Sequence, residues 1–361
     1  MNLRSPGPTP VPAEVAQAGA ADMINHRGPE FAAMLRRITD RVQQVFQTKN
    51  DLLTLTTSGT GGMEAAVVNF ISPGDKVLVV TIGEFGQRFV TLAKTYGADV
   101  QELAFENGTA ADPNRIDEAL ARDADIRTVL ITHNETSTGT TNVALNEIGK
   151  VVRGRDRLLI VDAISSLSSI PVEVDNWDLD VVISGSQKGW MVAPGLAFVS
   201  VNERAWAAAE RCTTPRFYFD LGRARKSLAS GETPWTPAVS IFFQMDKALD
   251  LMFAEGIENI YARHARHGRM TRDGARALGL ELFAAEGVES NTVTAIRVPE
   301  GVKAGDWLRI AREEFDTVFA GGQGELAGKI VRFGHLGYCT DDHIKAGLKA
   351  LEGSLARARG N

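Results

Sequence analysis

Short runs of apolar, mostly β-branched residues alternate along the N-terminal half of the chain with stretches whose apolar residues recur at helical spacing. The apolar runs predict strands over residues 52–57, 76–82, 99–105, 126–133, 157–163, 179–185 and 196–201. The stretches between them predict helices over residues 61–71, 86–97, 113–123 and 144–155. This alternation indicates an α/β fold, in which helices cover a mostly parallel sheet.

The remaining segments predict an arm and a second domain. The proline-rich stretch SPGPTPVP predicts an extended arm, and a helix should begin near Ala13. Residues 239–278 consist almost entirely of helix-forming residues, with a break expected at Gly256. The strand and helix patterns after this bridge are typical of a smaller α+β domain. We therefore expect an arm at 1–12, a large domain at 13–258 and a small C-terminal domain at 259–361.

Composition narrows the class of partner. The 361 residues carry a formal net charge of −6 at pH 7, which offers no broad positive field to nucleic acid or to acidic membrane surfaces. The two cysteines, Cys212 and Cys339, lack metal-type spacing, and we expect both to be reduced thiols in a cytoplasmic protein. The sequence has neither a secretory signal pattern nor an apolar stretch of membrane-spanning length. A small-molecule partner is favoured.

Two charged residues follow predicted strands directly. Lys188, in SGSQKGW, lies just beyond the strand 179–185, and Asp162, in VDAISSL, ends the strand 157–163. Ligands of parallel sheets bind where the carboxyl ends of the strands meet, so both residues are candidates for one site. The alternatives are a solvated loop lysine and an aspartate that caps a following helix.

Two more segments occupy similar positions. SGTGGMEAA leads from a strand into a helix that begins near Thr60, and the free N–H groups of a helix start can bind phosphate. The segment completes neither the dinucleotide-binding fingerprint nor a P-loop, so a tight turn that requires small residues is the alternative. Phe85, in GEFGQR, is either a core aromatic or a flat surface for a planar ring.

Arg332, in GKIVRFGHLG, stands between two apolar residues of a predicted strand, so its guanidinium must meet an anion or solvent. Arginine captures a carboxylate through two parallel hydrogen bonds, and a surface ion pair is the alternative. Taken together, these residues match the needs of pyridoxal 5'-phosphate. That cofactor requires a phosphate site, an acid at its pyridinium nitrogen, an aromatic on its ring face and a lysine for its Schiff base.

The chain also resembles the class V aminotransferases of the fold-type I pyridoxal-phosphate superfamily, near their alanine:glyoxylate and serine:pyruvate branch. The resemblance rests on nine segments in order: SPGPTPVP, NHRGPEF, SGTGGMEAA, FGQR, HNETSTG, VDAISSL, SGSQKGW, PWTPAVS and GKIVRFGHLG. It implies a large domain with a mostly parallel, mixed sheet and a smaller α+β domain. It also implies that Lys188 forms the Schiff base and that Asp162 pairs with the ring nitrogen of pyridoxal 5'-phosphate.

The resemblance implies further roles. Phe85 should stack on the ring, where the mammalian alanine:glyoxylate enzymes carry tryptophan. Ser137 should lie near the ring hydroxyl, and Arg332 should hold the carboxylate of the substrate. Thr236, in PWTP, should reach the phosphate from the neighbouring subunit, although Thr233 replaces the tyrosine that the family has three positions earlier. The phosphate itself should be bound by Ser58, Gly59, Thr60 and Gln187.

The implied activity is transamination between a small 2-amino acid, alanine or serine, and a 2-oxo acid, glyoxylate or pyruvate, in a homodimer with composite sites. We place no second arginine for a side-chain carboxylate, which favours neutral donors. Within the enzymes, aspartate, an ureido amino acid or an aminophosphonate is the alternative donor. A desulfurase would need a cysteine before the carboxylate-binding arginine, whereas Cys339 follows Arg332. A non-catalytic relative that serves as a binding or assembly module is the remaining alternative.

The histidines predict no metal site. His264 and His267, in RHARHGR, lie in an arginine-rich stretch with no carboxylate before Asp273, so we expect a solvated helix face. His133 follows a predicted strand, and we assign it no role.

Overall fold

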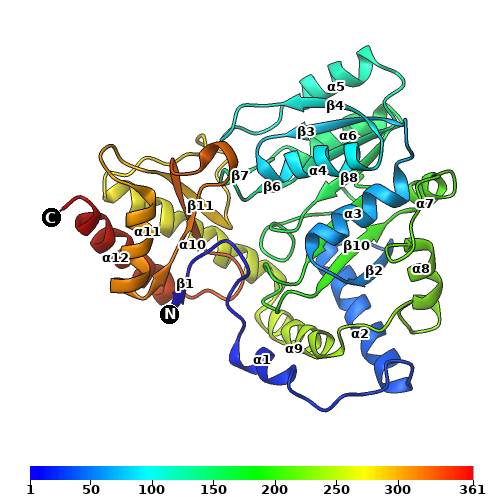
Figure 1. Cartoon of the computed structure of the whole chain (residues 1–361). Coiled ribbons are helices and arrows are strands. Elements are labelled where there is room, and N and C mark those ends of the chain that lie inside the picture. The colour runs from blue at the N-terminus through cyan, green and yellow to red at the C-terminus, as the bar shows by residue number, and fades with distance from the viewer. Residues whose placement is uncertain (361) are drawn as a thin grey trace.

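The computed structural model describes residues 1–360 and shows two units side by side (Figure 1). The larger unit contains a seven-stranded sheet between helices, and the smaller one contains a three-stranded sheet and the C-terminal helices. The N-terminal segment passes between the two units. Within the described residues, no helix is long and apolar enough to cross a membrane.

The large sheet is mixed and mostly parallel. Its strands are β2 (Asp51–Thr56), β3 (Lys76–Thr81), β4 (Asp99–Ala104), β5 (Thr128–Thr132), β8 (Leu158–Asp162), β9 (Val181–Gly185) and β10 (Leu196–Val201), in the order β2-β10-β9-β8-β5-β3-β4. β10 runs antiparallel to β2 and β9, whereas the other neighbours are parallel. All seven predicted strands are confirmed, with ends within two residues of those expected.

Helices cover both faces of this sheet. One face packs against α1 (Ala13–Ala18), α2 (Pro29–Phe46), α5 (Pro113–Arg122), α6 (Leu145–Gly154) and α9 (Val239–Glu255). The other packs against α3 (Gly59–Phe70), α4 (Glu84–Thr95), α7 (Glu203–Ala209) and α8 (Leu221–Ala229). Successive side chains of a strand point to opposite faces, so Leu78 and Val80 join the first apolar core and Val77 and Val79 the second. The four helices predicted between strands are confirmed as α3 to α6.

The smaller unit has its own core. β11 (Val293–Arg297), β14 (Ile330–Gly334) and β13 (Ala320–Gly321) pair antiparallel in that order. They pack with α10 (Ile257–Ala277), α11 (Ala304–Phe315) and α12 (Asp341–Ala358), beside a 3-10 turn at Gly324–Leu326. The predicted break between α9 and α10 is confirmed at Gly256, whose φ of +88° suits glycine. The domain limits at 12 and 258 stay predictions, and residue 361 lies outside the described part of the chain.

The N-terminal arm is tied to both units. β1 (Asn2–Leu3) pairs in parallel with β12 (Thr317–Val318), and the N–H of Gly334 donates to the carbonyl of Arg4 at 2.6 Å. Farther along the arm, the N–H of Thr9 donates to the carbonyl of Gln187 in the large unit at 3.0 Å. The arm therefore crosses the carboxyl edge of the large sheet. A two-stranded hairpin at the same edge, β6 (Asn134–Glu135) with β7 (Thr140–Thr141), follows β5.

The prediction of a solvated face at His264 and His267 is wrong, because both side chains are fully buried. The N–H of Gly337 donates to Nε2 of His264 at 3.0 Å, and Nε2 of His267 lies 2.8 Å from a carboxylate oxygen of Asp341. The buried stripe of α10 recurs every three or four residues, and the two histidines occupy it while the arginines of RHARHGR lie on other faces. Each histidine is a packed core residue with a protein partner.

Candidate active site

Asp162 and Lys188 lie at the same edge of the large sheet. Asp162 is the last residue of β8, and Lys188 follows the end of the neighbouring parallel strand β9 by three positions. Both are buried, with exposed fractions of 3% and 9%. Their positions are therefore consistent with the prediction that the two side chains share a site. The charge of each residue also shifts the pKa of the other.

The carboxylate of Asp162 is held by the backbone beyond its strand. Its Oδ1 accepts a hydrogen bond of 2.9 Å from the N–H of Ile164, and Thr132 Oγ1 lies 3.4 Å from Oδ2. Burial raises the pKa of Asp162 to about 6, and the nearby carboxylate of Glu135 acts in the same direction. A cationic partner on the open side of this buried carboxylate would stabilise its charged form.

The amine of Lys188 lies under the N-terminal arm, where Nζ donates a hydrogen bond of 2.7 Å to the carbonyl of Pro6. The pKa of Lys188 is lowered to about 8, chiefly by burial; the charge of Asp162 opposes this shift, and the charges of Arg332 and Arg88 add to it. A lowered pKa makes the neutral, nucleophilic amine accessible at mildly alkaline pH.

The start of α3 offers the predicted phosphate cradle. Within residues 1–360, the side chain of the N-cap residue Ser58 makes no capping hydrogen bond to the helix, so the first N–H groups remain available. A Cβ on Gly59 would lie 2.7 Å from Cδ1 of Ile164, which explains the need for glycine at this close approach. Beyond it, Oε1 of Gln187 is buried without a hydrogen-bond partner in the described chain. The free helix start suits the phosphate of pyridoxal 5'-phosphate. Oε1 of Gln187 only accepts hydrogen bonds, so the amide Nε2 of that side chain is the atom that would donate to the phosphate.

The start of α4 places Phe85 near two residues, Glu135 and Arg88, whose roles were not predicted from the sequence. The N–H groups of Phe85 and Gly86 donate to Oε2 of the buried Glu135, at 3.0 and 3.2 Å. The guanidinium of Arg88 lies 4.6 Å from the ring centre of Phe85 and donates to Thr60 Oγ1 at 2.9 Å. Arg88 thus links the aromatic candidate to the cradle. Its spacing of three from Phe85 in FGQR places both on one helix face, a signal that was available in the sequence.

Ser137 is engaged within its own loop. Its hydroxyl donates to Oε1 of Glu135 at 2.6 Å and accepts from the N–H of Glu84 at 3.0 Å. These contacts hold the loop after β6 against the start of α4. The assigned contact between Ser137 and the ring hydroxyl stays a prediction. The Ser137 hydroxyl already donates its proton to Glu135, so a ligand would have to donate to its remaining lone pair.

Arg332 projects from the middle of β14 and is 5% exposed. Its Nε donates to the carbonyl of Gly321 at 2.8 Å, and Nη1 donates to the carbonyl of Thr136 at 3.2 Å. Its charge lowers the pKa of Lys188, which places it in the same electrostatic environment. These contacts orient the guanidinium and leave Nη2 free among the described residues. A substrate carboxylate can meet its Nη1–Nη2 edge if it replaces the long contact of 3.4 Å between Nη1 and Oε1 of Gln323.

The remaining sequence candidates lie elsewhere. Thr236 is exposed and follows a stack of aromatic rings, Trp235 with Phe217 and Tyr218, on the surface. His133 packs edge-on against Trp177, and burial lowers its pKa to about 4. Cys339 is buried beside the guanidinium of Arg4, and burial raises the pKa of its thiol. Neither His133 nor Cys339 therefore has the exposed, reactive setting of a catalytic group.

Comparison with known proteins places this site in a family. Residues 2–323 match the family described as Aminotransferase class-V. The chain is 43% identical over 357 residues to the "Soluble hydrogenase, small subunit" of Synechococcus sp. (strain PCC 6716), covering 98% of this chain and 92% of that protein. It is 37% identical over 360 residues to the L-aspartate–glyoxylate aminotransferase of Paracoccus denitrificans, covering 97% and 90%.

A solved structure gives the same result. The alanine–glyoxylate aminotransferase of Nostoc sp. superposes with a TM-score of 0.94 at 30% identity, covering 98% of this chain and 94% of that one. The match extends over both units and includes the edge of the sheet where Asp162 and Lys188 lie. The chain belongs to the class-V aminotransferase family, the pyridoxal-phosphate-dependent transaminases of fold type I.

Proposed function

We propose that this transaminase moves the amino group of a small neutral 2-amino acid, alanine or serine, to glyoxylate or pyruvate. The observation that carries the proposal is Arg332, a buried guanidinium oriented by backbone carbonyls within the electrostatic reach of Lys188. A forked cation at this position suits the carboxylate that every 2-amino acid and 2-oxo acid carries. A short side chain suits a site that the arm covers closely.

The residues that would hold pyridoxal 5'-phosphate follow from the site. The start of α3 and Gln187 would take the phosphate, Phe85 would lie on the ring face, and Asp162 would face the ring nitrogen. Thr236 would contribute from a second subunit. When bound, the cofactor supplies an electron sink for the electron pair of the substrate Cα–H bond.

The chain supplies the other steps. Arg332 holds the substrate carboxylate and so fixes the direction of the Cα–H bond. Asp162 keeps a proton on the ring nitrogen. Burial raises the pKa of this carboxyl group, so a cationic ring that faces it stabilises its charged form. Lys188 binds the cofactor at rest, and its neutral amine removes and returns the proton at the substrate Cα. The covering arm limits the access of water to these groups.

An acidic donor such as aspartate is the second candidate. Arg88 is a second guanidinium whose charge reaches Lys188, and it also reaches Asp162. The Paracoccus relative is named for aspartate and glyoxylate. Against it, Arg88 already contacts Thr60 and the ring of Phe85. The activity in the name of the Synechococcus relative is not the one we propose, since Lys188, Asp162 and Arg332 together supply what transamination requires.

One experiment tests both donors. The purified protein with bound cofactor should show the visible absorbance of a lysine-linked cofactor, and L-alanine or L-serine should bleach it in a single turnover. Glyoxylate should then restore it. Faster bleaching by L-aspartate than by L-alanine would favour the acidic donor, and a protein without the absorbance band would favour a non-catalytic role.

We further propose a homodimer with composite sites. Phe217 and Tyr218 expose 64% and 44% of their surface and stack with Trp235 immediately before Thr236. A cluster of exposed aromatic rings is typical of an interface core. Sedimentation should therefore give a dimer at micromolar concentration, and Trp235→Ser should weaken both the dimer and cofactor binding. An active monomer would contradict the proposal.

A further inference from the structure

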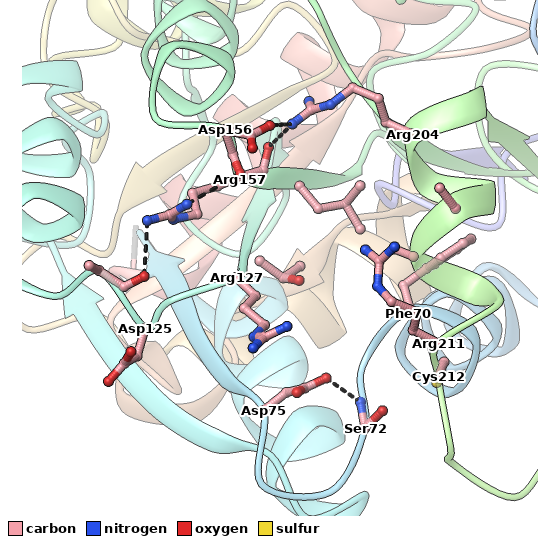
Figure 2. A pocket seen from close by; sticks show the side chains of 15 residues that line it. Phe70, Ser72, Asp75, Asp125, Arg127, Asp156, Arg157, Arg204, Arg211 and Cys212 are labelled. Atoms are coloured by element: carbon pink, nitrogen blue, oxygen red, sulfur yellow. Dashed lines mark hydrogen bonds and ion pairs between the residues drawn. The ribbon is translucent and has the colours of Figure 1, made fainter.

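A cleft of about 500 Å³ lies at the opposite edge of the large sheet from Lys188 (Figure 2). Its walls include Thr128 and Leu158, the first residues of β5 and β8, whereas the active site lies at the carboxyl ends of these strands. The segment after α3 and the end of α7 complete the cleft. A volume of this size is within the usual range of small-molecule sites, and its position separates it from the transamination chemistry.

Four arginines line the cleft, and the side chains of two of them have partners within the protein. Arg204 pairs with the buried Asp180 at 3.2 Å and with Asp156 at 2.9 Å. Arg157 donates to the carbonyl of Ala124 at 3.0 Å. Both side chains are therefore fixed in the wall, where they contribute to the shape of the cleft.

Arg127 and Arg211 differ from this pair. Among residues 1–360, neither side chain forms an ion pair or a hydrogen bond, and Figure 2 shows both projecting into the hollow. The backbone of Arg127 is fixed, since its N–H donates to Lys76 and its carbonyl accepts from Leu158, both at 3.0 Å. Arg211 lies two residues beyond the end of α7, where its N–H donates to the carbonyl of Ala208 at 3.1 Å. Both residues are exposed, so two solvated cations face one open cleft from different segments of the chain.

None of the carboxylates that line the cleft forms an ion pair with these two cations among the described residues. The side chains of Asp125 and Asp156 are 87% and 92% exposed, so they meet solvent at the rim. One oxygen of Asp75 accepts from the N–H of Ser72 at 2.8 Å. The hydroxyl of Ser72 accepts from the N–H of Thr213 at 3.1 Å and keeps its own proton to donate. The cavity therefore presents the guanidinium groups of Arg127 and Arg211, unpaired among the described residues, and a hydroxyl donor, together with the carboxylate of Asp75 and the hydrogen-bonded guanidinium of Arg157 in its wall.

We propose that this cleft binds a small phosphorylated metabolite, with its phosphoryl group between Arg127 and Arg211. A tetrahedral phosphoryl group accepts from two guanidinium forks and a hydroxyl at once, whereas a planar carboxylate is matched by a single fork. The cleft is larger than a bare phosphate requires, and the apolar side chains of Phe70 and Leu158 border it. They provide a surface for the carbon part of the ligand.

Cys212 allows a test confined to this cleft. Its thiol lines the cavity and is half-buried, whereas Cys339 is 3% exposed and lies in the smaller unit. The alkylation rate of Cys212 is measured by mass spectrometry on the enzyme saturated with its cofactor, so that the cofactor's own phosphate site is filled. Inorganic pyrophosphate is the probe, at constant ionic strength, and succinate represents dicarboxylates. Calorimetry gives the affinity.

We expect pyrophosphate to slow alkylation of Cys212, with succinate much weaker. Arg127→Gln and Arg211→Gln should each weaken pyrophosphate binding about tenfold or more, because each removes a charge-assisted contact. Arg312→Gln removes an exposed arginine of α11 that likewise forms no ion pair with the described residues, and it should bind as the wild type does. Protection absent from the wild type, or lost equally in all three variants, would overturn the proposal. Equal protection by succinate would overturn the phosphoryl assignment.

Discussion

The Nζ of Lys188 donates a hydrogen bond of 2.7 Å to the backbone carbonyl of Pro6, although the two residues stand 182 positions apart. The next residue of the arm, Gly7, has a φ of +135°, and a Cβ there would lie 2.6 Å from the same Nζ. The arm is therefore part of the wall around the lysine. Its glycine is required both by the backbone angle and by the closeness of the lysine.

Gly7→Ala should accordingly damage the site. The added methyl group must displace either the arm or Lys188, so we expect kcat/KM for L-alanine to fall about tenfold or more, together with a weaker affinity for the cofactor. Gly301→Ala is the matched control, since Gly301 also has a positive φ, of +78°, but has no atom within 4 Å of the added Cβ. The control should lose about 1 kcal/mol of stability and keep its activity. Equal kinetic losses in both variants would show that backbone strain alone is responsible.

Lys188→Met should abolish turnover and stabilise the cofactor-free fold at neutral pH. Burial lowers the pKa of Lys188 from 10.5 to about 8, so between these values the unfolded chain binds a proton that the folded chain lacks. The wild type therefore gains stability as pH rises through this window, and at pH 7 it bears the full cost of a buried charge. We expect the variant to be about 1 to 3 kcal/mol more stable at pH 7, with the difference shrinking toward pH 10.

Denaturant unfolding of the cofactor-free proteins at several pH values measures this difference. Lys150→Met replaces an exposed lysine of α6 and should leave the pH dependence unchanged. A Lys188 variant whose stability runs parallel to the wild type at every pH would mean that the pKa of this lysine is not lowered in the folded chain.

The sequence allowed the sheet and the position of Asp162 and Lys188 at the carboxyl ends of its strands to be predicted for a physical reason. β8 and β9 are continuous apolar runs that end abruptly in polar residues, and neighbouring parallel strands bring such ends together. Both the element and its functional end are therefore encoded locally.

The contact between Pro6 and Lys188 could not be predicted in this way. It uses a backbone carbonyl, which every residue has, and it joins distant segments, so no residue pattern marks it. The burial of His264 and His267 was missed because the neighbouring arginines dominate the composition of that helix, although the buried stripe follows from helical spacing. Glu135 carries no signal of its own, since its role depends on how β6 meets α4.

Asp162→Asn should retain the cofactor but lower kcat by two orders of magnitude or more, since a neutral amide does not hold a proton at the ring nitrogen. Asp180→Asn is the control, because Asp180 is a buried carboxylate at the other edge of the sheet, where it accepts from the N–H of Leu159 at 2.8 Å. The control should lose stability and keep its kcat. Stopped-flow and steady-state kinetics measure both, and an unchanged kcat in Asp162→Asn would remove the assigned role.

Arg88→Gln should weaken cofactor binding about tenfold and raise the pKa of Lys188. The substitution removes the contact with Thr60 and the cation over the ring of Phe85, and it removes a positive charge that lowers the lysine pKa. Cofactor affinity is measured by quenching of tryptophan fluorescence, a readout independent of turnover. Arg115→Gln breaks a similar arginine–aromatic pair, over Phe105 at 4.5 Å, outside the site and should change neither property.

Arg332→Lys tests the carboxylate site most directly. Lysine keeps the charge but loses the fork, and the loss of one charge-assisted hydrogen bond costs about 1.5 to 3 kcal/mol. We therefore expect kcat/KM for L-alanine to fall roughly tenfold to a hundredfold. Arg297→Lys changes an arginine of the neighbouring strand β11 that lies over the ring of Phe283, and it should leave the kinetics unaltered.

The substrate itself provides the sharper control for Arg332. Ethylamine has no carboxylate, so its slow reaction never uses the fork and should proceed at nearly the same rate in Arg332→Lys as in the wild type. Single-turnover bleaching of the bound cofactor with L-alanine and with ethylamine separates two explanations. A loss confined to L-alanine places the carboxylate on Arg332. A parallel loss for both amines would mean that the arginine supports the loop at Thr136 and the strand β13 at Gly321, to which it donates, and that the carboxylate is bound elsewhere.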